Sequence, residues 1–359
     1  MYIKAISSTI PGLNNTYGEL YPTRKILETI TREDAKIDPG FIEKVCGIKS
    51  VALTHDTLQA VSEKNPHARN NALYAMLDDS IGKCLVQLAE KEDVKDPQIK
   101  YHIHIIGFSE PILEFRLKNI RKKYKLPSDM STYLIEQGCS GVLEALKLCE
   151  VILSGTKNVN ILVTGENNML THVWDRYSRH ASADNLDSWL WQVIFGEGVG
   201  AMVIGNSEDK PRNGCFWKVS HLEKSIVCDD WRVAEISNEG KPQIFIRARD
   251  VRQTYLQAMP EKLAKGREFF NGDENISYIL HESNPKILQK VVTDMGLKNV
   301  LSISASVGTL ACVSSFSLLD RVHIKQHEKG CYNNIVMALI GETHGNISGG
   351  FVCLTPFTG

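Results

Sequence analysis

The sequence lacks any stretch long and apolar enough to cross a membrane, and it lacks an excess of charge of either sign. None of its apolar runs reaches the roughly 18 residues that indicate a membrane-spanning helix. Its 41 basic and 42 acidic residues leave a formal net charge of -1, so no affinity for nucleic acid or acidic lipid is expected. The first residues have no signal-peptide core and begin like a strand, which predicts a cytoplasmic protein.

Cysteine is present, but without the spacings that would give it a structural role. The nine cysteines are scattered, their number is odd, and no two form a C-x-x-C pair. In a chain of 359 residues this predicts reduced thiols and argues against a disulfide framework or a structural zinc site. His102 and His104 have a spacing suited to metal binding, but no third ligand accompanies them, so no metal site is predicted.

Short apolar strands alternate with amphipathic helices, which predicts an α/β fold with parallel strands covered by helices. A strand, a turn and a helix follow one another at residues 133–146 and again at 299–322, so two related halves are expected. The polar residues 206–215 mark the boundary between them. We therefore predict an N-terminal half over residues 1–208, with a capping segment near 166–195, and a C-terminal half over residues 209–359.

Cys139 stands at the turn between a strand and a long helix. The first free amides of a helix and the positive end of its dipole favour a thiolate at this place. Gly138 and Gly141 on either side allow the backbone to approach closely. The position suits a nucleophile that carries an acyl group, and the alternative is a buried cysteine that fills a small gap in the core.

Four segments in order carry a resemblance to a known family: the turn at 137–141, the glycine-rich stretch at 195–201, residues 280–287 around His281, and the tail at 343–354. They resemble the β-ketoacyl-acyl-carrier-protein synthase III family of the thiolase superfamily over nearly the whole chain. The resemblance implies a thiolase fold, in which two similar halves form five layers, α-β-α-β-α. It also implies that Cys139 attacks an acyl thioester and that His281 acts as a base or hydrogen-bond donor.

The chain departs from the family pattern at two places that matter for chemistry. Thr309 stands where the resemblance implies an asparagine that helps to stabilise the enolate formed when a malonyl group loses carbon dioxide. A threonine has one hydroxyl and no amide, which puts decarboxylative condensation in doubt. Phe41 and Val45 replace a tryptophan and an arginine that embrace coenzyme A, so the inference of coenzyme A binding is weakened.

The tail at 343–354 stands where the family has a glycine-rich closing loop, and His344 takes the place of a glycine in that loop. His344 is either a second acid/base or substitute donor near the site, or a histidine on a surface loop. The resemblance places the oxyanion amides in the nucleophile turn, where Ser140 follows Cys139, and in this loop at Gly345. The remaining candidates, assigned to substrate binding, are Phe41, Asn284 and Phe195. The alternative for the Phe195 segment is a tight structural turn.

The function predicted from these residues is that of an acyltransferase or condensing enzyme. It would load an acyl group from an acyl-carrier-protein or coenzyme A thioester onto Cys139 and transfer it to a second substrate, in specialised polyketide or fatty-acid-derived metabolism. No cofactor is implied beyond the thioester substrate. A homodimer formed through strands near 160–164 is expected, or a place in a hetero-oligomeric complex. The alternative function is a partner-dependent, weakly active or non-catalytic subunit of such a complex.

Overall fold

Ten strands form one hydrogen-bonded sheet, and its two ends repeat the same topology. The computed structural model describes residues 1–13, 18–30, 38, 40–61, 65–92, 95–108, 110, 112–170, 190, 193–206, 216–228, 234–236, 242–244, 248–282, 284–343 and 346–357. In spatial order, the strands of the first half are β5 (Ser131–Glu136), β4 (Ile99–Ile106), β6 (Asn160–Glu166), β7 (Val199–Gly205) and β1 (Tyr2–Thr9). Those of the second half are β12 (Val300–Leu301), β11 (Ser277–Leu280), β13 (Ile335–Thr343), β14 (Asn346–Phe357) and β8 (Phe216–Cys228).

The strand directions repeat as well as the strand order. In the first half β4 is parallel to β5 and β6, and β7 is antiparallel to β6 and β1. In the second half β11 is parallel to β12 and β13, and β14 is antiparallel to β13 and β8. The halves join where β1 pairs with β8 at Tyr2 and Ile3. The repeat confirms the prediction of two similar halves, while the predicted boundary at 208/209 lies outside the described residues.

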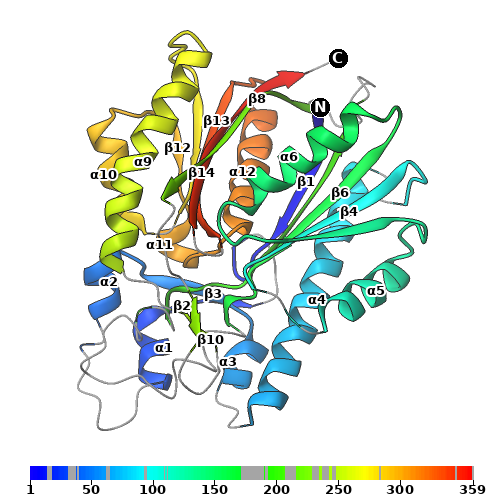
Figure 1. The fold of residues 1–359 in the computed structure, drawn as a ribbon. Helices are drawn as coiled ribbons and strands as arrows, with labels where there is room; N and C mark the ends of the chain where they lie inside the picture. Colours follow the sequence, from blue (N-terminus) through cyan, green and yellow to red (C-terminus); the bar gives the residue numbers. More distant parts are fainter. Residues whose placement is uncertain are drawn as a thin grey trace.

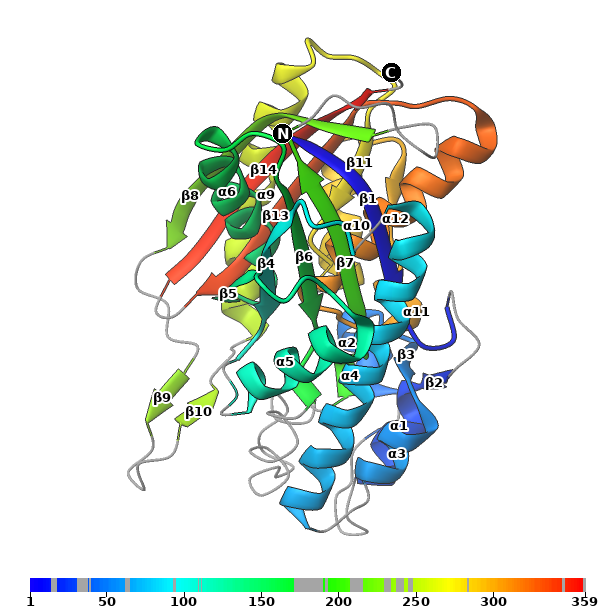
Figure 2. The ribbon, with the colours of Figure 1, turned by 90° about the vertical axis from the view of Figure 1, so that its right-hand side faces the viewer.

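Helices cover both outer faces and fill the space between the halves (Figure 1). Helices α4 (Pro66–Lys91) and α5 (Leu113–Tyr124) cover the first half, whereas α9 (Ala248–Phe269) and α10 (Pro285–Asp294) cover the second. The middle layer holds α6 (Gly141–Ser154) and α12 (Val313–Lys329), each of which contacts strands of both halves. The arrangement is the predicted α-β-α-β-α order, and Figure 2 shows the strands between their helices from the side.

Helices cover both faces of the central strands and bury them. Every residue of β1, β6 and β7 is buried. Local signals fix the covering helices: Asn65 caps α4 by accepting from two amides, and Pro66 occupies its first position. No helix in the described part of the chain has the length and apolar composition that crossing a bilayer requires.

Smaller elements gather at one end of the sheet (Figure 1). The amide of Lys49 donates to Ala305 and the hydroxyl of Ser50 donates to Ser306, which ties this end of the first half to the second. The capping segment predicted near 166–195 falls largely on residues outside those described. The smaller elements are β2 (Glu19–Pro22), β3 (Ser50–Leu53), α1 (Thr23–Ile30), α2 (Phe41–Cys46), α3 (His55–Val61), α11 (Ser304–Val307), β9 (Ala234–Ile236) and β10 (Pro242–Ile244).

One expectation about assembly is wrong. Strand β6, which contains residues 160–164, pairs with β4 on one side and β7 on the other, so its backbone has no edge to offer a second chain. The strand that ends the sheet in the first half is β5, where Tyr133 and Leu134 are 40% and 42% exposed. An apolar strand edge of this kind is where another strand can pair.

Candidate active site

Cys139 lies in the turn that follows β5, directly before α6 begins at Gly141. The Gly141 amide donates to the Gly138 carbonyl at 3.4 Å, and the Leu143 amide donates to Ser140 at 2.9 Å, so the turn closes directly into the helix. Cys139 is half-buried. The thiol therefore sits at the N-terminus of a 14-residue helix, the place at which a thiolate is favoured.

The nucleophile turn, residues 138–140, is seated against the β13–β14 hairpin of the other half. A Cβ atom added to Gly341 would overlap the amide nitrogen of Ser140, so only a glycine permits the two backbones to approach this closely. Gly341 pairs with Ser348 across the hairpin, and the Ser348 hydroxyl lies 3.0 Å from that of Ser140. Ser140 thus contacts the second half, and its predicted part in an oxyanion site stays a prediction.

His281 follows β11 directly and is held by its backbone on both sides. Its amide donates to the Ala338 carbonyl at 3.0 Å, and its own carbonyl accepts from the Tyr255 hydroxyl at 2.5 Å. The side chain is 6% exposed, and neither ring nitrogen has a hydrogen-bond partner among the described residues. Burial lowers the pKa of His281 to about 4, so the imidazole is neutral at pH 7.

Strand β13 brings the cysteine turn and the histidine together. Ala338 of this strand accepts from His281, and Gly341 of the same strand packs against Ser140. The two positions are separated by about 10 Å of strand, since a strand rises roughly 3.3 Å per residue. Both Cys139 and His281 follow strands that belong to parallel pairs, and both lie at the carboxyl end of their strand. The position of the cysteine turn relative to His281 is therefore set by contacts with a single strand, β13.

The glycine-rich stretch at 195–201 makes a second contact between the halves. Phe195 is buried and forms a bridge to Thr309. The Thr309 amide donates to Ile194 at 2.7 Å, and its carbonyl accepts from Gly196 and from the Asn167 side chain, both at 3.1 Å. A Cβ on Gly196 would overlap the Val307 carbonyl oxygen, which explains the glycine. Thr309 therefore holds this contact through its backbone.

Glu197, inside the same stretch, is buried and accepts two hydrogen bonds. The Thr54 amide donates to Oε2 at 2.6 Å, and the Thr57 hydroxyl donates to Oε1. Burial raises the pKa of Glu197 to about 7 despite these two donors. The side chain links the stretch to α3 and gives the structural interpretation of the motif a physical basis.

The other predicted residues have mixed placements. Asn284 caps α10, with its Oδ1 accepting from the amides of Lys286 and Ile287. Phe41 begins α2 and packs, partly buried, against a cluster of buried apolar side chains that includes Ile42 and Leu280. Contacts of either residue with a substrate stay predictions. His344 and Gly345 lie outside the described residues.

Sequence reasoning missed Tyr255, Ser348 and Asn167, which hold the site residues in place. Each acts across a long separation in the chain: Tyr255 and His281 are 26 residues apart, and Ser140 and Ser348 are 208 apart. Asn167 donates to Gly196 at 2.7 Å as well as to Thr309. The sequence offers no local signal for such contacts, because a serine within a strand looks like any other.

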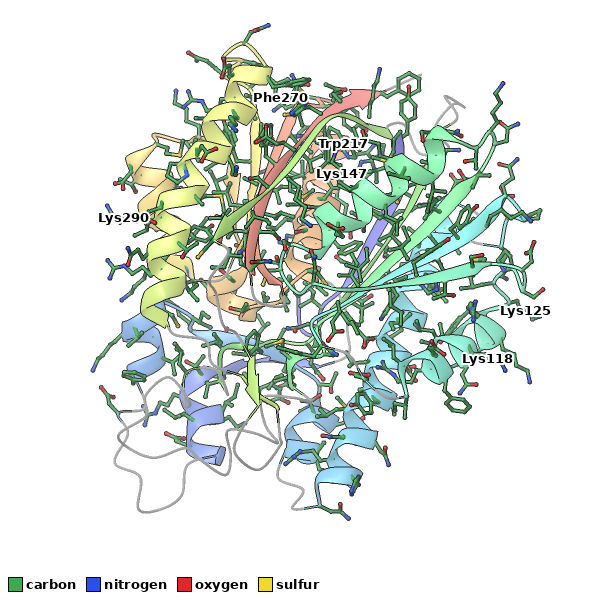
Figure 3. The ribbon with its side chains drawn as sticks, viewed as in Figure 1. Lys118, Lys125, Lys147, Trp217, Phe270 and Lys290 are labelled. Carbon is green, nitrogen blue, oxygen red and sulfur yellow. The ribbon has the colours of Figure 1, made fainter. Side chains whose placement is uncertain are left out.

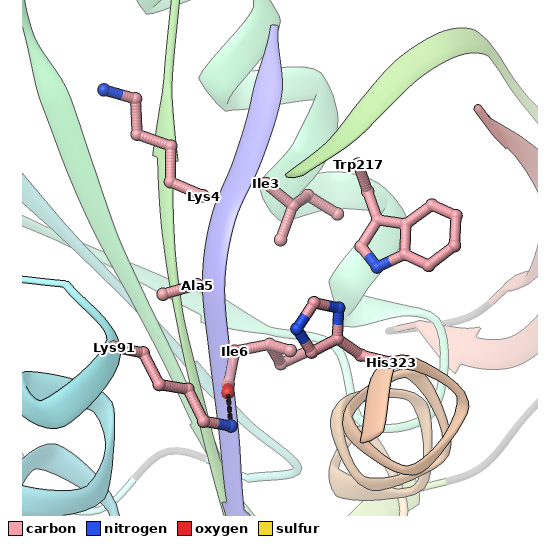
Figure 4. Close-up of a pocket in the computed structure, with 7 residues that line it drawn as sticks. All are labelled: Ile3, Lys4, Ala5, Ile6, Lys91, Trp217 and His323. Atoms are coloured by element: carbon pink, nitrogen blue, oxygen red, sulfur yellow. Dashed lines mark hydrogen bonds between the residues drawn. The ribbon is translucent and has the colours of Figure 1, made fainter. Parts of the chain in front are cut away.

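Two hollows lie elsewhere in the described part of the molecule. One has a volume of about 20 Å³, lies between β1, α12 and the start of β8, and is lined by Ile6, Trp217 and His323 (Figure 4). Its size suits about one water molecule and excludes an acyl group. The other is a groove of about 490 Å³ between α5 and β5, lined by Phe115 and Arg121 among others.

Helix α5 is basic where it faces outward. Lys118 lies on this helix and Lys125 directly after it, and both side chains extend from the surface in Figure 3. Arg116, by contrast, is 4% exposed and forms ion pairs with Asp78, Glu110 and Glu166. Lys118 and Lys125 therefore lie on a surface exposed to solvent, whereas Arg116 is turned into the protein.

Comparison with known proteins gives a partial sequence match. No model of a protein family matches the chain. Over 165 residues it is 26% identical to β-ketoacyl-[acyl-carrier-protein] synthase III of Acholeplasma laidlawii, covering 45% of this chain and 46% of that protein. The match thus spans less than half the length of the curated relative.

Solved structures match the chain over its whole length. OleA of Xanthomonas campestris, as a histidine-to-alanine variant, has a TM-score of 0.72 at 13% identity, covering 99% of this chain and 98% of that one. A cysteine-to-serine variant of OleA with bound lauric acid and lauroyl-CoA has a TM-score of 0.73 at 13% identity, with 99% and 98% covered. The type III polyketide synthase 1,3,6,8-tetrahydroxynaphthalene synthase of Streptomyces coelicolor has a TM-score of 0.73 at 14% identity, with 100% of both chains covered. These likenesses confirm the predicted thiolase fold, and the sequence match to the curated relative supports the resemblance to synthase III.

Proposed function

We propose that this chain, with its thiolase fold and its resemblance to synthase III, is an acyltransferase of the condensing type. It takes an acyl group from a coenzyme A or carrier-protein thioester onto Cys139 and passes it to a second substrate. The observation that carries the proposal is the anchoring of the Cys139 turn and of His281 to one strand, β13. A nucleophile at a helix N-terminus and a neutral imidazole beside the same strand form an acyl-transfer pair.

In the first step the Cys139 thiolate attacks the carbonyl carbon of the thioester. A new carbon–sulfur bond forms to Cys139, the bond to the donor sulfur breaks, and the donor leaves as a thiol that takes up the proton released by Cys139. Charge develops on the carbonyl oxygen during the attack, and backbone amides of the nucleophile turn are the donors that would stabilise it. The Cys139 acyl thioester is the intermediate.

In the second step the acceptor attacks the Cys139 thioester, and the cysteine thiolate leaves. With a pKa of about 4, His281 is a weak base, but as a neutral imidazole it keeps one N–H donor at pH 7. Its main role is then to donate a hydrogen bond to the oxygen that gains negative charge. A minor role is to accept the proton that the acceptor loses.

The side chain at Thr309 decides which acceptor suits the site. Three kinds of acceptor need no decarboxylation: a carbon nucleophile that is already acidic, such as a 3-ketoacyl thioester; an amine; or a hydroxyl. The missing asparagine is tolerable for each of them. Because the Thr309 backbone makes the contacts to Ile194, Gly196 and Asn167, a Thr309→Asn variant should fold. This variant should release carbon dioxide from malonyl thioesters at least about tenfold faster than the wild type. A well-placed hydrogen-bond donor ordinarily raises such a rate by roughly 10²- to 10³-fold, so a tenfold gain is a modest expectation. An equal rate would show that position 309 does not face the enolate.

The relatives support an acyl thioester donor and a place in fatty-acid or polyketide chemistry. One OleA structure contains lauroyl-CoA, the curated relative is a synthase that acts with acyl-carrier protein, and the Streptomyces protein is a polyketide synthase. The eight cysteines in the described part of the chain are all reduced, which suits a cytoplasmic location. We extend the proposal to a homodimer, to be tested by light scattering after size exclusion.

The deciding experiment is intact-protein mass spectrometry after incubation with a panel of acyl-CoA and acyl-carrier-protein thioesters. The wild type should gain the mass of one acyl group, and the Cys139→Ala variant should not. Cys331→Ala is the matched control, because this exposed thiol lies in a different part of the molecule and its loss should leave the adduct intact. Absence of an adduct with every donor, also in the presence of partner proteins, would favour a non-catalytic subunit.

A further inference from the structure

Ser140 occupies the N-cap position of α6 but does not cap it. A serine at this position ordinarily accepts a hydrogen bond from an amide in the first turn, which stabilises the helix. Here the Ser140 hydroxyl instead lies 3.0 Å from the Ser348 hydroxyl, which belongs to β14 in the other half of the molecule. The Ser140 side chain therefore contributes a contact between the halves and does not stabilise the first turn of its own helix.

Both hydroxyls are buried, so each depends on the other. Ser140 is 0% and Ser348 2% exposed. Buried polar groups are nearly always paired, and removing one member leaves the second without the bond it makes here. The pair is therefore a specific link, in which one hydroxyl donates and the other accepts, and it is shielded from water that could replace either partner.

The link sits beside the feature that joins the two parts of the proposed active site. Ser348 is opposite Gly341 in the β13–β14 hairpin, and the Gly341 backbone packs against Ser140. Three residues earlier, the same strand accepts a hydrogen bond from His281. Glycine at 341 allows close approach but supplies no directional bond, whereas the Ser348 hydroxyl supplies one. The bond fixes where the residue next to Cys139 lies relative to the strand that holds His281.

We propose that Ser348 is a positioning residue that holds the Cys139 turn in register with His281 through its bond to Ser140. The inference rests on the proposed function of Cys139 as the acyl carrier. Ser348 itself forms no bond to the substrate and transfers no proton. A misplacement of about 1 Å between reacting groups lowers a rate by roughly 10²-fold, so loss of this bond should act on the chemical step.

The test compares Ser348→Ala with Ser348→Thr, which keeps the hydroxyl. Ser348→Ala should lower kcat for acyl transfer by roughly 10- to 100-fold with KM changed less than about twofold, and Ser348→Thr should recover most of the loss. Ser220→Ala is the matched control. Its hydroxyl makes a similar bond, 2.7 Å to Thr355 between β8 and β14, away from the turn, and its loss should leave kcat unchanged.

A second readout does not require the acyl reaction. The rate at which iodoacetamide alkylates Cys139 is measured from pH 6 to pH 10 by peptide mass spectrometry, with the exposed Cys331 as an internal reference. In Ser348→Ala the pH midpoint for Cys139 should rise and its rate at pH 7 should fall, while Cys331 is unchanged. If the wild type forms no acyl adduct, the proposed function fails, but this comparison still decides the role of Ser348.

The result that overturns the inference is a Cys139 alkylation profile in folded Ser348→Ala equal to that of the wild type. Should this variant fail to fold, Ser140→Ala removes the same bond from the other side and should give the same shift. With all variants in hand, the double variant should be no slower than either single one, since both remove one interaction. Effects that add would show that the serines act separately and would also refute the inference.

Discussion

Replacing His281 with phenylalanine should abolish acyl transfer and at the same time make the folded protein more stable. The side chain is buried, and both of its ring nitrogens have no hydrogen-bond partner among the described residues. An unpartnered buried polar group costs about 1–3 kcal/mol of stability. Phenylalanine has a similar shape without this cost, so the free energy of unfolding at pH 7.5 should rise by about 1–3 kcal/mol.

The gain should grow as the pH falls. The unfolded chain binds a proton at His281 below its ordinary pKa of 6.5, whereas the folded protein takes it up only near pH 4. Between these values the unfolded state binds more protons, so the wild type loses stability on acidification from pH 6.5 to pH 4. At 1.36 kcal/mol for each pKa unit, that loss amounts to roughly 3 kcal/mol, and His281→Phe should not show it.

The assay is equilibrium unfolding in urea at pH 7.5 and pH 5, followed by tryptophan fluorescence. His104→Phe is the contrasting control, because His104 is also buried but its Nδ1 lies 2.7 Å from the Thr164 hydroxyl and its Nε2 lies 3.9 Å from a Glu166 oxygen. That variant should lose about 1–3 kcal/mol by breaking a buried bond. If His281→Phe destabilises the protein as much as His104→Phe, the His281 ring is paired in the folded state and the reasoning is refuted.

Three further changes test the surroundings of the site. Gly341→Ala should force its Cβ against the Ser140 backbone and reduce acyl transfer by roughly 10²-fold, as measured by single-turnover kinetics; an unchanged rate would mean that the close contact is absent. Tyr255→Phe should remove the 2.5 Å bond to the His281 carbonyl and lower stability by about 1 kcal/mol in urea unfolding. Glu197 has a raised pKa of about 7 against 4.5 in the unfolded chain, so it contributes a loss of stability as the pH rises from 4.5 to 7; Glu197→Gln should flatten this part of the stability profile.

The resemblance to synthase III singles out Cys139 and His281 as the proposed reacting residues, and local patterns place both of them at strand ends. Cys139 lies between an apolar strand and an amphipathic helix, and His281 follows a short apolar strand, so both are expected at strand ends. The repeat of strand, turn and helix also predicts two similar halves, which the strand orders confirm. The strand ends and the repeated strand–turn–helix unit are encoded by residues that are neighbours along the chain, so patterns of apolar residues reveal them.

The supporting contacts depend on residues that are distant along the chain, and no local pattern encodes them. Arg116 shows the difficulty, because it lies in a helix that the sequence presents as basic and exposed. Its guanidinium is buried and binds Glu166 through two nitrogens at 3.0 Å. Burial alone would raise the pKa of Glu166, but Arg116 and, with it, His104 outweigh that effect and lower the pKa to about 2. Which basic residue turns inward is decided by carboxylates on other elements.

The repeat places the segments of the proposed site where the halves meet. The turn of Cys139 follows β5, and the segment that leads to Thr309 follows β12, the corresponding strand of the second half. Each turn contacts the opposite half: Ser140 meets Gly341 and Ser348, and Thr309 meets Ile194 and Gly196. Strands β1 and β8 pair at only two positions, so the alignment between the halves depends on these turn contacts together with α6 and α12, which contact strands of both halves. A change that loosens either turn should therefore alter the distance from Cys139 to His281 before it unfolds either half.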